Sequence, residues 1–152
     1  MKILLDTNIV IHREAPTVVD EDIGILFRWL DNLHHIKCLH SVTAEELEKH
    51  EDPKVRKSFK VKLANYNILK TKPPMSDDVR RISMQLDIDQ NDLNDTLIIN
   101  ELYSGRVDAL ITEDKKLHNK ASLLGISERV YTIDAFLEKV TAENPELADY
   151  KV

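Results

Sequence analysis

The alternation of short apolar segments with longer amphipathic ones constrains the fold of this chain more than any other feature. The short segments typical of strands read "KILL" (2–5), "IKCLH" (36–40), "DALIT" (108–112) and "VYT" (130–132). The apolar residues of "KILL" are continuous rather than alternating, which predicts a strand buried on both faces, as in a parallel sheet. Helices between successive strands would supply the crossovers that parallel strands need. We therefore expect an α/β fold in which helices cover both faces of a short, mainly parallel sheet of roughly four or five strands.

Apolar residues at helical spacing predict helices over residues 20–34, 43–51, 53–66, 76–87, 92–104, 114–124 and 133–140. Ser76 is the expected N-cap of one helix, and Gly125 is expected to end another. A chain of 152 residues fits one domain with a sizeable core. We place this domain at residues 1–140 and interpret the polar segment 141–152 as a tail or linker.

The composition favours a cytoplasmic protein that does not enter a membrane. No run approaches the roughly 18–20 apolar residues of a membrane span, and the first residues lack the apolar segment of a signal peptide. Cys38 is the only cysteine, so no disulfide can form within the chain.

Charge is distributed unevenly along the chain. The net charge is −6, yet the stretch from Lys54 to Lys72 holds seven basic residues and no acidic one, so the remainder carries −13. An acidic cluster that binds metal, next to a basic segment that binds phosphate, would produce this division. A solvated basic helix face on an acidic protein would produce it as well, so charge alone leaves both interpretations open.

Two predicted strands are followed directly by an acid. Asp6 comes after "KILL", and Asp114 follows "DALIT" and Glu113. Sites in open parallel sheets form outside the carboxyl ends of the strands. One acid at such a place is usually a helix N-cap, but acids after two different strands predict a shared site.

Two further candidate acids lie on predicted helices. Glu46 belongs to "SVTAEELEKH", where Thr43 and Glu46 also fit a capping box. Asp95 belongs to "NDLNDTLIINEL" and lies one helical turn after Asp92, so both face the same way. Asp92 is also explained as a favourable charge in the first helical turn. Asp95 lies deeper, beside the apolar residues, and that explanation does not extend to it.

Four carboxylates in one place repel each other strongly. At an effective dielectric constant of about 20, two unit charges ~4 Å apart cost about 4 kcal/mol. Such a cluster persists only with bound cations or raised pKa values. Oxygen ligands suit Mg²⁺ or Mn²⁺, and the usual chemistry of this arrangement is phosphodiester hydrolysis.

Four short motifs occur in the order "LLDTN" (4–8), "EL" (46–47), "DTLII" (95–99) and "LITEDKKL" (110–117). In this order they resemble the motifs of PIN domains, small α/β metal-dependent nucleases that include the VapC-type toxins of toxin–antitoxin pairs. The resemblance spans most of the chain, and the first and last motifs are the most specific as a pair. It implies the three-layer α/β sandwich of PIN domains.

The resemblance also implies catalytic residues, a cofactor and a substrate. Asp6, Glu46, Asp95 and Asp114 would be the catalytic residues and would bind one or two Mg²⁺ or Mn²⁺ ions, with Asp6 and Asp114 as the primary ligands. The supporting residues that it implies are Thr7, Asn8, Asp92 and Thr112. The implied activity is cleavage of single-stranded RNA. The implied protein partners are an antitoxin, another protein or a second copy of the chain.

The basic stretch is the expected nucleic-acid contact. Its apolar residues Val55, Phe59, Leu63 and Tyr66 recur at helical spacing and so favour a core-facing stripe, although Phe59 and Tyr66 could instead stack on bases. The cations expected on the outer face, where they would contribute affinity rather than sequence choice, are Arg56, Lys57, Lys60 and Lys62.

Other interpretations fit the sequence less well. "DIDQND" (87–92) begins like a calcium-binding EF-hand loop, but Asp92 and Ile98 occupy the positions that need Gly and Glu. "HHIKCLH" (34–40) offers His and Cys for zinc without a second ligand pair. A receiver-like signalling domain would need a phosphoacceptor on a third central strand. A non-catalytic PIN-like module that binds RNA or protein, and a nuclease acting on DNA, remain as the alternatives.

Overall fold

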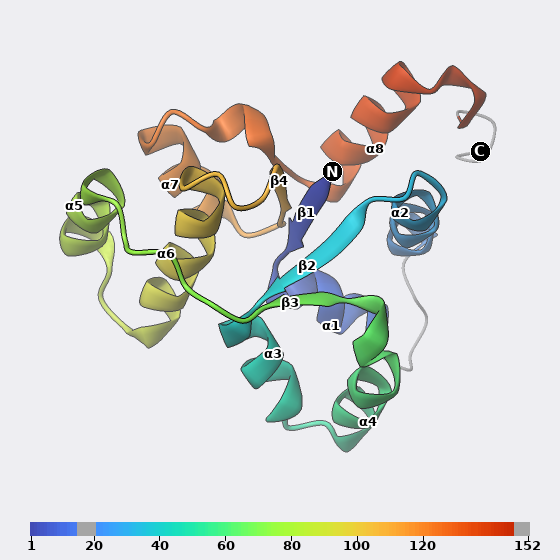
Figure 1. The fold of residues 1–152 in the computed structure, drawn as a ribbon, viewed down its shortest axis with the longest axis horizontal. Coiled ribbons are helices and arrows are strands. Elements are labelled where there is room, and N and C mark those ends of the chain that lie inside the picture. The colour runs from blue at the N-terminus through green and yellow to red at the C-terminus, as the bar shows by residue number, and fades with distance from the viewer. Residues whose placement is uncertain (15–20, 148–152) are drawn as a thin grey trace.

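The computed structural model describes residues 1–14 and 21–147, and it has an α/β fold built on one parallel sheet (Figure 1). The sheet has five strands in the order β3-β2-β1-β4-β5, and every neighbouring pair is parallel. The strands are β1 (Lys2–Leu5), β2 (Ile36–His40), β3 (Asn67–Leu69), β4 (Ala109–Ile111) and β5 (Val130–Tyr131). The predicted α/β class and the parallel sheet covered on both faces are therefore confirmed.

Helices connect the strands and form the two outer layers. They are α1 (Thr7–Glu14), α2 (Glu21–Asn32), α3 (Ser41–Glu48), α4 (Pro53–Lys62), α5 (Asp77–Leu86), α6 (Gln90–Tyr103), α7 (Lys115–Leu123) and α8 (Ile133–Glu143), with short 3₁₀ turns at Leu63–Asn65 and Ser127–Arg129. In Figure 1, α5, α6 and α7 lie to one side of the strands, and α2 and α8 lie to the other. Among these described residues, no helix has the length and apolar character that crossing a membrane requires.

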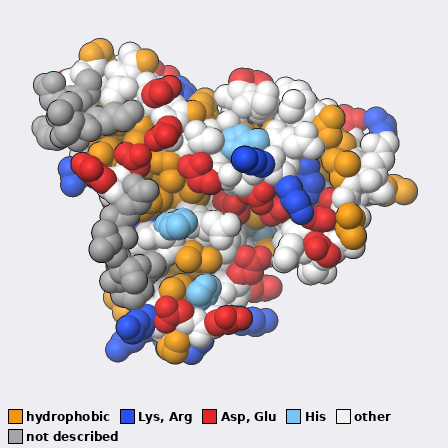
Figure 2. All heavy atoms as spheres, turned by 180° about the vertical axis from the view of Figure 1, so that it is seen from behind, with side chains coloured by type: hydrophobic (Ala, Val, Ile, Leu, Met, Phe, Trp, Pro, Cys, Tyr) orange, Lys and Arg blue, Asp and Glu red, His pale blue; other side chains and the backbone are white. Residues whose placement is uncertain are grey.

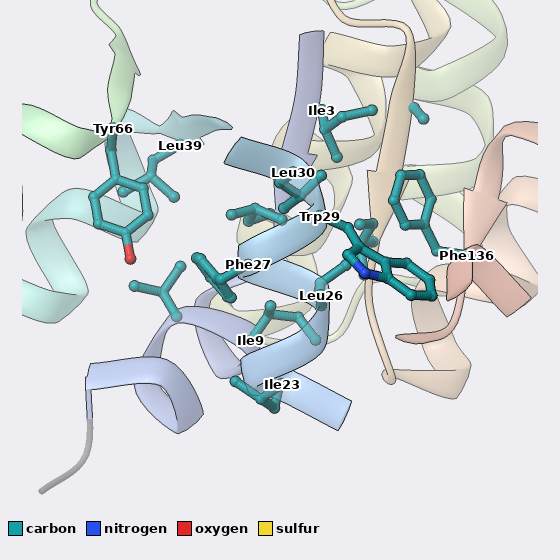
Figure 3. Packing of buried hydrophobic residues seen from close by; sticks show 14 of the residues in the cluster. Ile3, Ile9, Ile23, Leu26, Phe27, Trp29, Leu30, Leu39, Tyr66 and Phe136 are labelled. Atoms are coloured by element: carbon teal, nitrogen blue, oxygen red, sulfur yellow. The ribbon is translucent and has the colours of Figure 1, made fainter. Parts of the chain in front are cut away.

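The buried residues of β1 explain why its apolar run is continuous. Ile3 and Leu5 pack in a cluster with α2 and α8, whereas Leu4 points to the opposite face and packs with α6 and α7. All three side chains are fully buried. Successive strand residues face opposite sides, so a strand covered on both sides must be apolar at every position. Figure 3 shows the first cluster, in which Trp29 and Phe136 meet beside Ile3.

Two elements of the fold were not predicted from the sequence. Helix α1 begins directly after β1, and its apolar residues Ile9, Val10 and Ile11 are consecutive rather than spaced along one helix face. Strand β3 has only three residues, one of them the exposed Asn67, and it forms the edge of the sheet beside β2. Segments this short or this irregular carry little periodic signal.

The strand order sets the position of the candidate site. The chain runs outward from β1 through β2 to β3, and then returns to the other side of β1 with β4 and β5. The carboxyl ends of β1 and β4 therefore adjoin at a topological switch point, where ligands of open α/β sheets bind. The Asp6 amide donates to the Ile111 carbonyl oxygen at 3.2 Å, which extends the pairing to the ends of both strands.

Candidate active site

The ends of β1 and β4 are joined through the side chain of Thr112. Its hydroxyl donates to Asp6 Oδ2 at 2.7 Å and accepts the amide proton of Asp114 at 3.0 Å. The other oxygen of Asp6 accepts from the Thr7 amide at 2.8 Å. Thr112 is fully buried, and Asp6 is 5% exposed. The two acids predicted from the strand ends are thus brought together, and Thr112 fixes one relative to the other.

Helix α3 brings Glu46 to the same place. The hydroxyl of Thr43, which is fully buried, accepts from the Thr7 hydroxyl at 3.0 Å and so attaches α3 to the end of β1. His40 is the N-cap of α3, because its ring accepts from the Val42 amide. The capping-box interpretation of Thr43 and Glu46 is therefore wrong: Thr43 lies inside the helix, and Glu46 Oε1 accepts from the Asn94 amide group at 3.4 Å.

Helix α6 carries two acids with different surroundings. Asp89 is its N-cap, and Asp92 in the first turn accepts from the Ile88 amide at 3.0 Å and from Lys116 Nζ at 3.3 Å. The hydrogen bond from Ile88 and the pairing with Lys116 lower the pKa of Asp92. Asp95, one turn further, is half-buried and faces the other candidate acids.

The four predicted catalytic acids line one hollow of about 280 Å³. We call it the carboxylate hollow, and its lining residues are Asp6, Thr7, Asn8, Glu46, Asn91, Asn94, Asp95, Ile98 and Asp114. Asp92 does not line it, and Thr112 lies behind Asp6. Figure 2, which views the molecule from behind, shows acidic side chains gathered near the middle of that face, with lysine and arginine side chains beside them.

The electrostatics of the hollow show that its acids interact. Burial, together with the charges of Asp114 and Asp6, raises the pKa of Asp95 to about 7. The pKa of Asp6 is also raised, mainly by burial and additionally by Asp114 and Glu46, although its hydrogen bonds from Thr112 and Thr7 oppose the change. Negative charge therefore accumulates here without full compensation by nearby cations.

The donor groups of the hollow are of the kind that Mg²⁺ and Mn²⁺ prefer. Within residues 1–14 and 21–147, no three His, Cys, Asp or Glu side chains are already arranged as ligands of one metal ion. The hollow presents carboxylate and amide oxygens without thiol or imidazole, which is the ligand chemistry of hard divalent cations. The raised pKa of Asp95 indicates a charge that a bound cation would relieve. The lining residues therefore fit such an ion by their chemistry.

Several residues near the hollow were not predicted from the sequence. Asn91 and Asn94 line it because their face of α6 is turned toward α3, and the sequence alone does not show this packing. The ring of His118 bonds the Thr112 carbonyl oxygen at 2.8 Å. Lys120 is 4% exposed and donates to the Asp92 carbonyl oxygen and the Thr96 hydroxyl. The segment "LITEDKKLHNK" contains Lys115, Lys116 and Lys120, and nothing in its sequence shows that Lys120 is buried while the other two are exposed.

The basic stretch forms a second hollow, next to helix α3. Arg56, Lys57 and Lys60 line it, with an apolar floor and Glu48 at the end of α3, in a volume of about 580 Å³. We call it the basic hollow, and its remaining lining residues are Pro53, Phe59 and Leu63. Lys62, predicted with the other cations, does not line it. Of the predicted core-facing stripe, Val55, Phe59 and Tyr66 are buried, but Leu63 is 37% exposed at the rim.

The two segments that resemble calcium and zinc sites in the sequence have structural roles. In "DIDQND", Asp87 accepts from Ser83 and Thr96 at 2.5 Å each and pairs with Lys120 at 2.9 Å, while Asp89 caps α6. In "HHIKCLH", Cys38 is buried in β2, and the ring of His40 caps α3 through one nitrogen and lies 3.5 Å from the buried Glu101 carboxylate through the other.

Comparison of the chain with models of protein families, with curated proteins and with solved structures finds no significant match. The geometry and chemistry of the carboxylate hollow are therefore the grounds on which a function can be proposed.

Proposed function

We propose that this protein is a divalent-metal-dependent nuclease that hydrolyses phosphodiester bonds in single-stranded RNA. The observation that carries the proposal is the convergence of Asp6, Glu46, Asp95 and Asp114 on one hollow at the switch point of the sheet. These acids come from four separate parts of the chain, so sequence proximity does not explain their meeting. The PIN-like motifs in the sequence support the same function. The toxin of a toxin–antitoxin pair, with an antitoxin or a second copy as partner, is a narrower form of this proposal.

The residues of this site would have two roles, binding the metal ion and orienting its ligands. Asp6 and Asp114 would be the primary ligands of one or two ions, and Glu46 and Asp95 would complete the ligand set or orient it. A bound Mg²⁺ or Mn²⁺ supplies an activated water and stabilises charge on the phosphate. Thr112 holds the Asp6 carboxylate in one orientation through its hydroxyl, and Asn94 does the same for Glu46. Such hydrogen bonds limit the reorganisation needed when substrate binds.

Cations on α7 and α4, outside the carboxylate hollow, would bind the phosphates of the RNA. Lys116 lies at the start of α7 with an exposed side chain, and Lys57 and Lys60 lie on α4. None of the three lines the carboxylate hollow itself. A phosphate backbone that crosses the hollow would meet this positive charge outside it, which contributes affinity without selecting a sequence.

A cleavage assay tests the function directly. Labelled single-stranded RNA and DNA are incubated with the wild type and with Asp6→Asn, in Mn²⁺ and in EDTA. We expect Mn²⁺-dependent cleavage of RNA by the wild type and a loss of at least ~100-fold in Asp6→Asn, because a primary ligand is removed. Asp134→Asn, which changes an exposed carboxylate on α8, is the matched control and should cut like the wild type.

The main alternative is a non-catalytic module that binds RNA or protein, and the absence of a ready three-ligand arrangement among the described residues favours it. That alternative predicts no cleavage by any variant and no rise of the melting temperature in millimolar Mn²⁺. The nuclease proposal predicts such a rise in the wild type, by selective binding of the ion to the folded state, and a smaller rise in Asp6→Asn. Wild-type protein that neither cuts nor responds to Mn²⁺ would contradict the proposal.

A further inference from the structure

The loop between α5 and α6 presents an apolar side chain to solvent on a fixed backbone. Ile88 is 92% exposed, and Leu86, at the end of α5, is 40% exposed. The Ile88 amide donates to Asp92 Oδ2, and the preceding Asp87 is held by Ser83, Thr96 and Lys120. Hydrogen bonds on both sides thus fix the position of an isoleucine that contributes nothing to the core.

Ile88 forms one wall of a small hollow of about 220 Å³ between this loop and α7. We call it the loop hollow, and its lining residues are Leu86, Ile88, Asp92, Lys116, Asn119 and Lys120. Its composition is two-sided. The aliphatic side chains come from the end of α5 and the loop that follows it, two lysines and an amide come from α7, and the carboxylate of Asp92 comes from α6. An apolar surface facing a cation and a hydrogen-bonding group suits a planar base attached to a phosphate.

The loop hollow adjoins the carboxylate hollow through α6 and α7. On α6, Asp92 lines the loop hollow, and Asp95, one helical turn later, lines the carboxylate hollow. On α7, the Lys116 amide donates to Asp114 Oδ1 at 2.9 Å, and the Lys116 side chain lines the loop hollow. An RNA strand with a phosphate at the carboxylates would reach the loop hollow if it continued along α6 and α7.

Cations and carboxylates meet at the loop hollow: Lys116 pairs with Asp92 and lies near Asp89 and Asp114, and its exposed ammonium group is the one that a phosphate would meet. Asp92 is the carboxylate on its wall, and both of its oxygens are already engaged, one by the Ile88 amide and the other by Lys116. The Lys116 side chain is 71% exposed, so its remaining N–H groups are available to a ligand. Lys115, the preceding residue, is exposed as well.

We propose that the loop hollow is a nucleotide subsite, in which a base of single-stranded nucleic acid packs against Ile88 and Leu86 and its phosphate meets Lys116. This inference rests on the proposed function, because it assumes that the strand occupies the carboxylate hollow. Asn119 supplies an amide that can bond the edge of the base. Ile88 and Leu86 offer apolar contact and not aromatic stacking, so the subsite takes a base that is unstacked from its neighbours without selecting a particular one.

Binding of a fluorescein-labelled single-stranded RNA oligonucleotide tests the subsite without requiring cleavage. Affinity is measured by anisotropy in Mn²⁺ with the Asp6→Asn protein, alone and combined with Ile88→Ala or Ile88→Trp. We expect Ile88→Ala to weaken binding about threefold to tenfold, and Ile88→Trp to strengthen it by a similar factor, since an indole offers a larger stacking surface. Ile88 is 92% exposed, so neither substitution should affect folding. Leu123→Ala, an exposed apolar residue on α7 outside the hollow, is the matched control.

An oligonucleotide of the same length with abasic residues distinguishes the contribution of the bases to binding from that of the sugar-phosphate backbone. The subsite predicts that the effects of Ile88→Ala and Ile88→Trp disappear on the abasic strand. Equal affinities of all variants for the normal strand would overturn the subsite, as would an unchanged effect on the abasic strand. A concentration-dependent dimer that Ile88→Ala abolishes, without any effect on RNA binding, would overturn it in favour of a protein interface. Wild-type protein that binds as expected but does not cut would contradict the nuclease function alone.

Discussion

Asp95 is the residue whose ionisation depends most on its surroundings. Burial and the neighbouring charges of Asp114 and Asp6 raise its pKa from 3.8 to about 7. The folded, metal-free protein therefore binds this proton more tightly than the unfolded chain does. The resulting contribution to stability is complete below about pH 4 and is lost as the pH rises toward 7.

Asp95→Asn should consequently stabilise the metal-free protein above neutral pH. We expect a gain of about 1–2 kcal/mol at pH 8 in EDTA, which corresponds to roughly 2–8 °C in melting temperature at this chain length. The gain should fall close to zero at pH 4, where Asp95 is protonated in the folded protein and partly protonated in the unfolded chain. Thermal melting between pH 4 and 8 measures this, with Asp134→Asn as the control. A gain that is the same at both pH values would mean that Asp95 does not ionise in this range.

Three of the four predicted catalytic residues occupy places with a chemical signature in the sequence, whereas the assignment of Glu46 depends on the resemblance to PIN domains. Asp6 and Asp114 follow strands, and Asp95 precedes a buried stripe. Their partners could not be found in the same way. Thr43 contacts Thr7, and Asn94 contacts Glu46, across 36 and 48 residues respectively. No local pattern encodes such a pairing, because it depends on how α3 and α6 pack on the strand ends.

At the scale of elements, α6 is held in place by a buried lysine of α7. Lys120 donates to the Asp92 carbonyl oxygen at 2.9 Å and to Thr96 Oγ1 at 3.0 Å, and it pairs with Asp87. The side chains of Lys120 and Asp87 are 5% and 9% exposed. This contact fixes the first turns of α6, and therefore the position from which Asp95 enters the carboxylate hollow.

Lys120→Met should destabilise the protein strongly. Removing one partner of a buried ion pair leaves the Asp87 carboxylate uncompensated, and we expect a loss of about 3–5 kcal/mol in the free energy of unfolding. Denaturant unfolding at pH 7 measures it. The double variant Lys120→Met with Asp87→Leu should recover part of the loss, because no charge remains buried. A loss below about 1 kcal/mol in the single variant would show that the pair is not important for stability.

The ends of helices α7 and α8 show why some element boundaries could be predicted from the sequence and others could not. Helix α7 ends as expected at Gly125, whose φ of 72° is the left-handed conformation that glycine adopts without strain. The boundary at residue 140 illustrates the opposite case. Helix α8 continues to Glu143, and Leu147 packs against the core, so part of the segment interpreted as a polar tail is structured. The predicted tail residues 148–152 lie outside the described part of the chain.

At the scale of the whole molecule, positive charge is concentrated on α4 while the rest of the protein is acidic. Lys57 and Lys60 are exposed at the basic hollow and have no ion-pair partner among the described residues. Arg56 differs, because its guanidinium group donates to the carbonyl oxygens of His50 and Glu51 and so helps to hold the α3–α4 connection. The two lysines can therefore bind phosphate without giving up an ion pair of the folded protein.

Lys57→Gln with Lys60→Gln should weaken RNA binding and reduce its dependence on salt. Each phosphate contact to a single strand contributes about 0.7 to the slope of log affinity against log salt concentration, so the slope should fall by roughly 1.4. Binding titrations between 50 and 200 mM salt, roughly the range in which such effects are large, measure it. Arg80→Gln with Arg81→Gln on α5 removes the same charge from exposed, acid-paired positions and is the control. Equal slopes for both double variants would attribute the effect to net charge alone.

Because β1 lies at the centre of the sheet, the carboxylate hollow can form only late in synthesis of the chain. The hydrogen bond from Thr112 to Asp6 joins residues that are 106 positions apart. The ribosome makes the chain from the N-terminus, so Asp6 is synthesised long before Thr112, which lies in the last third of the sequence. During synthesis, the Asp6 carboxylate therefore lacks the hydrogen bond from Thr112 that fixes its orientation in the folded protein. Any activity of the carboxylate hollow would begin only after the second half of the sheet has docked, which couples the onset of function to completion of the fold.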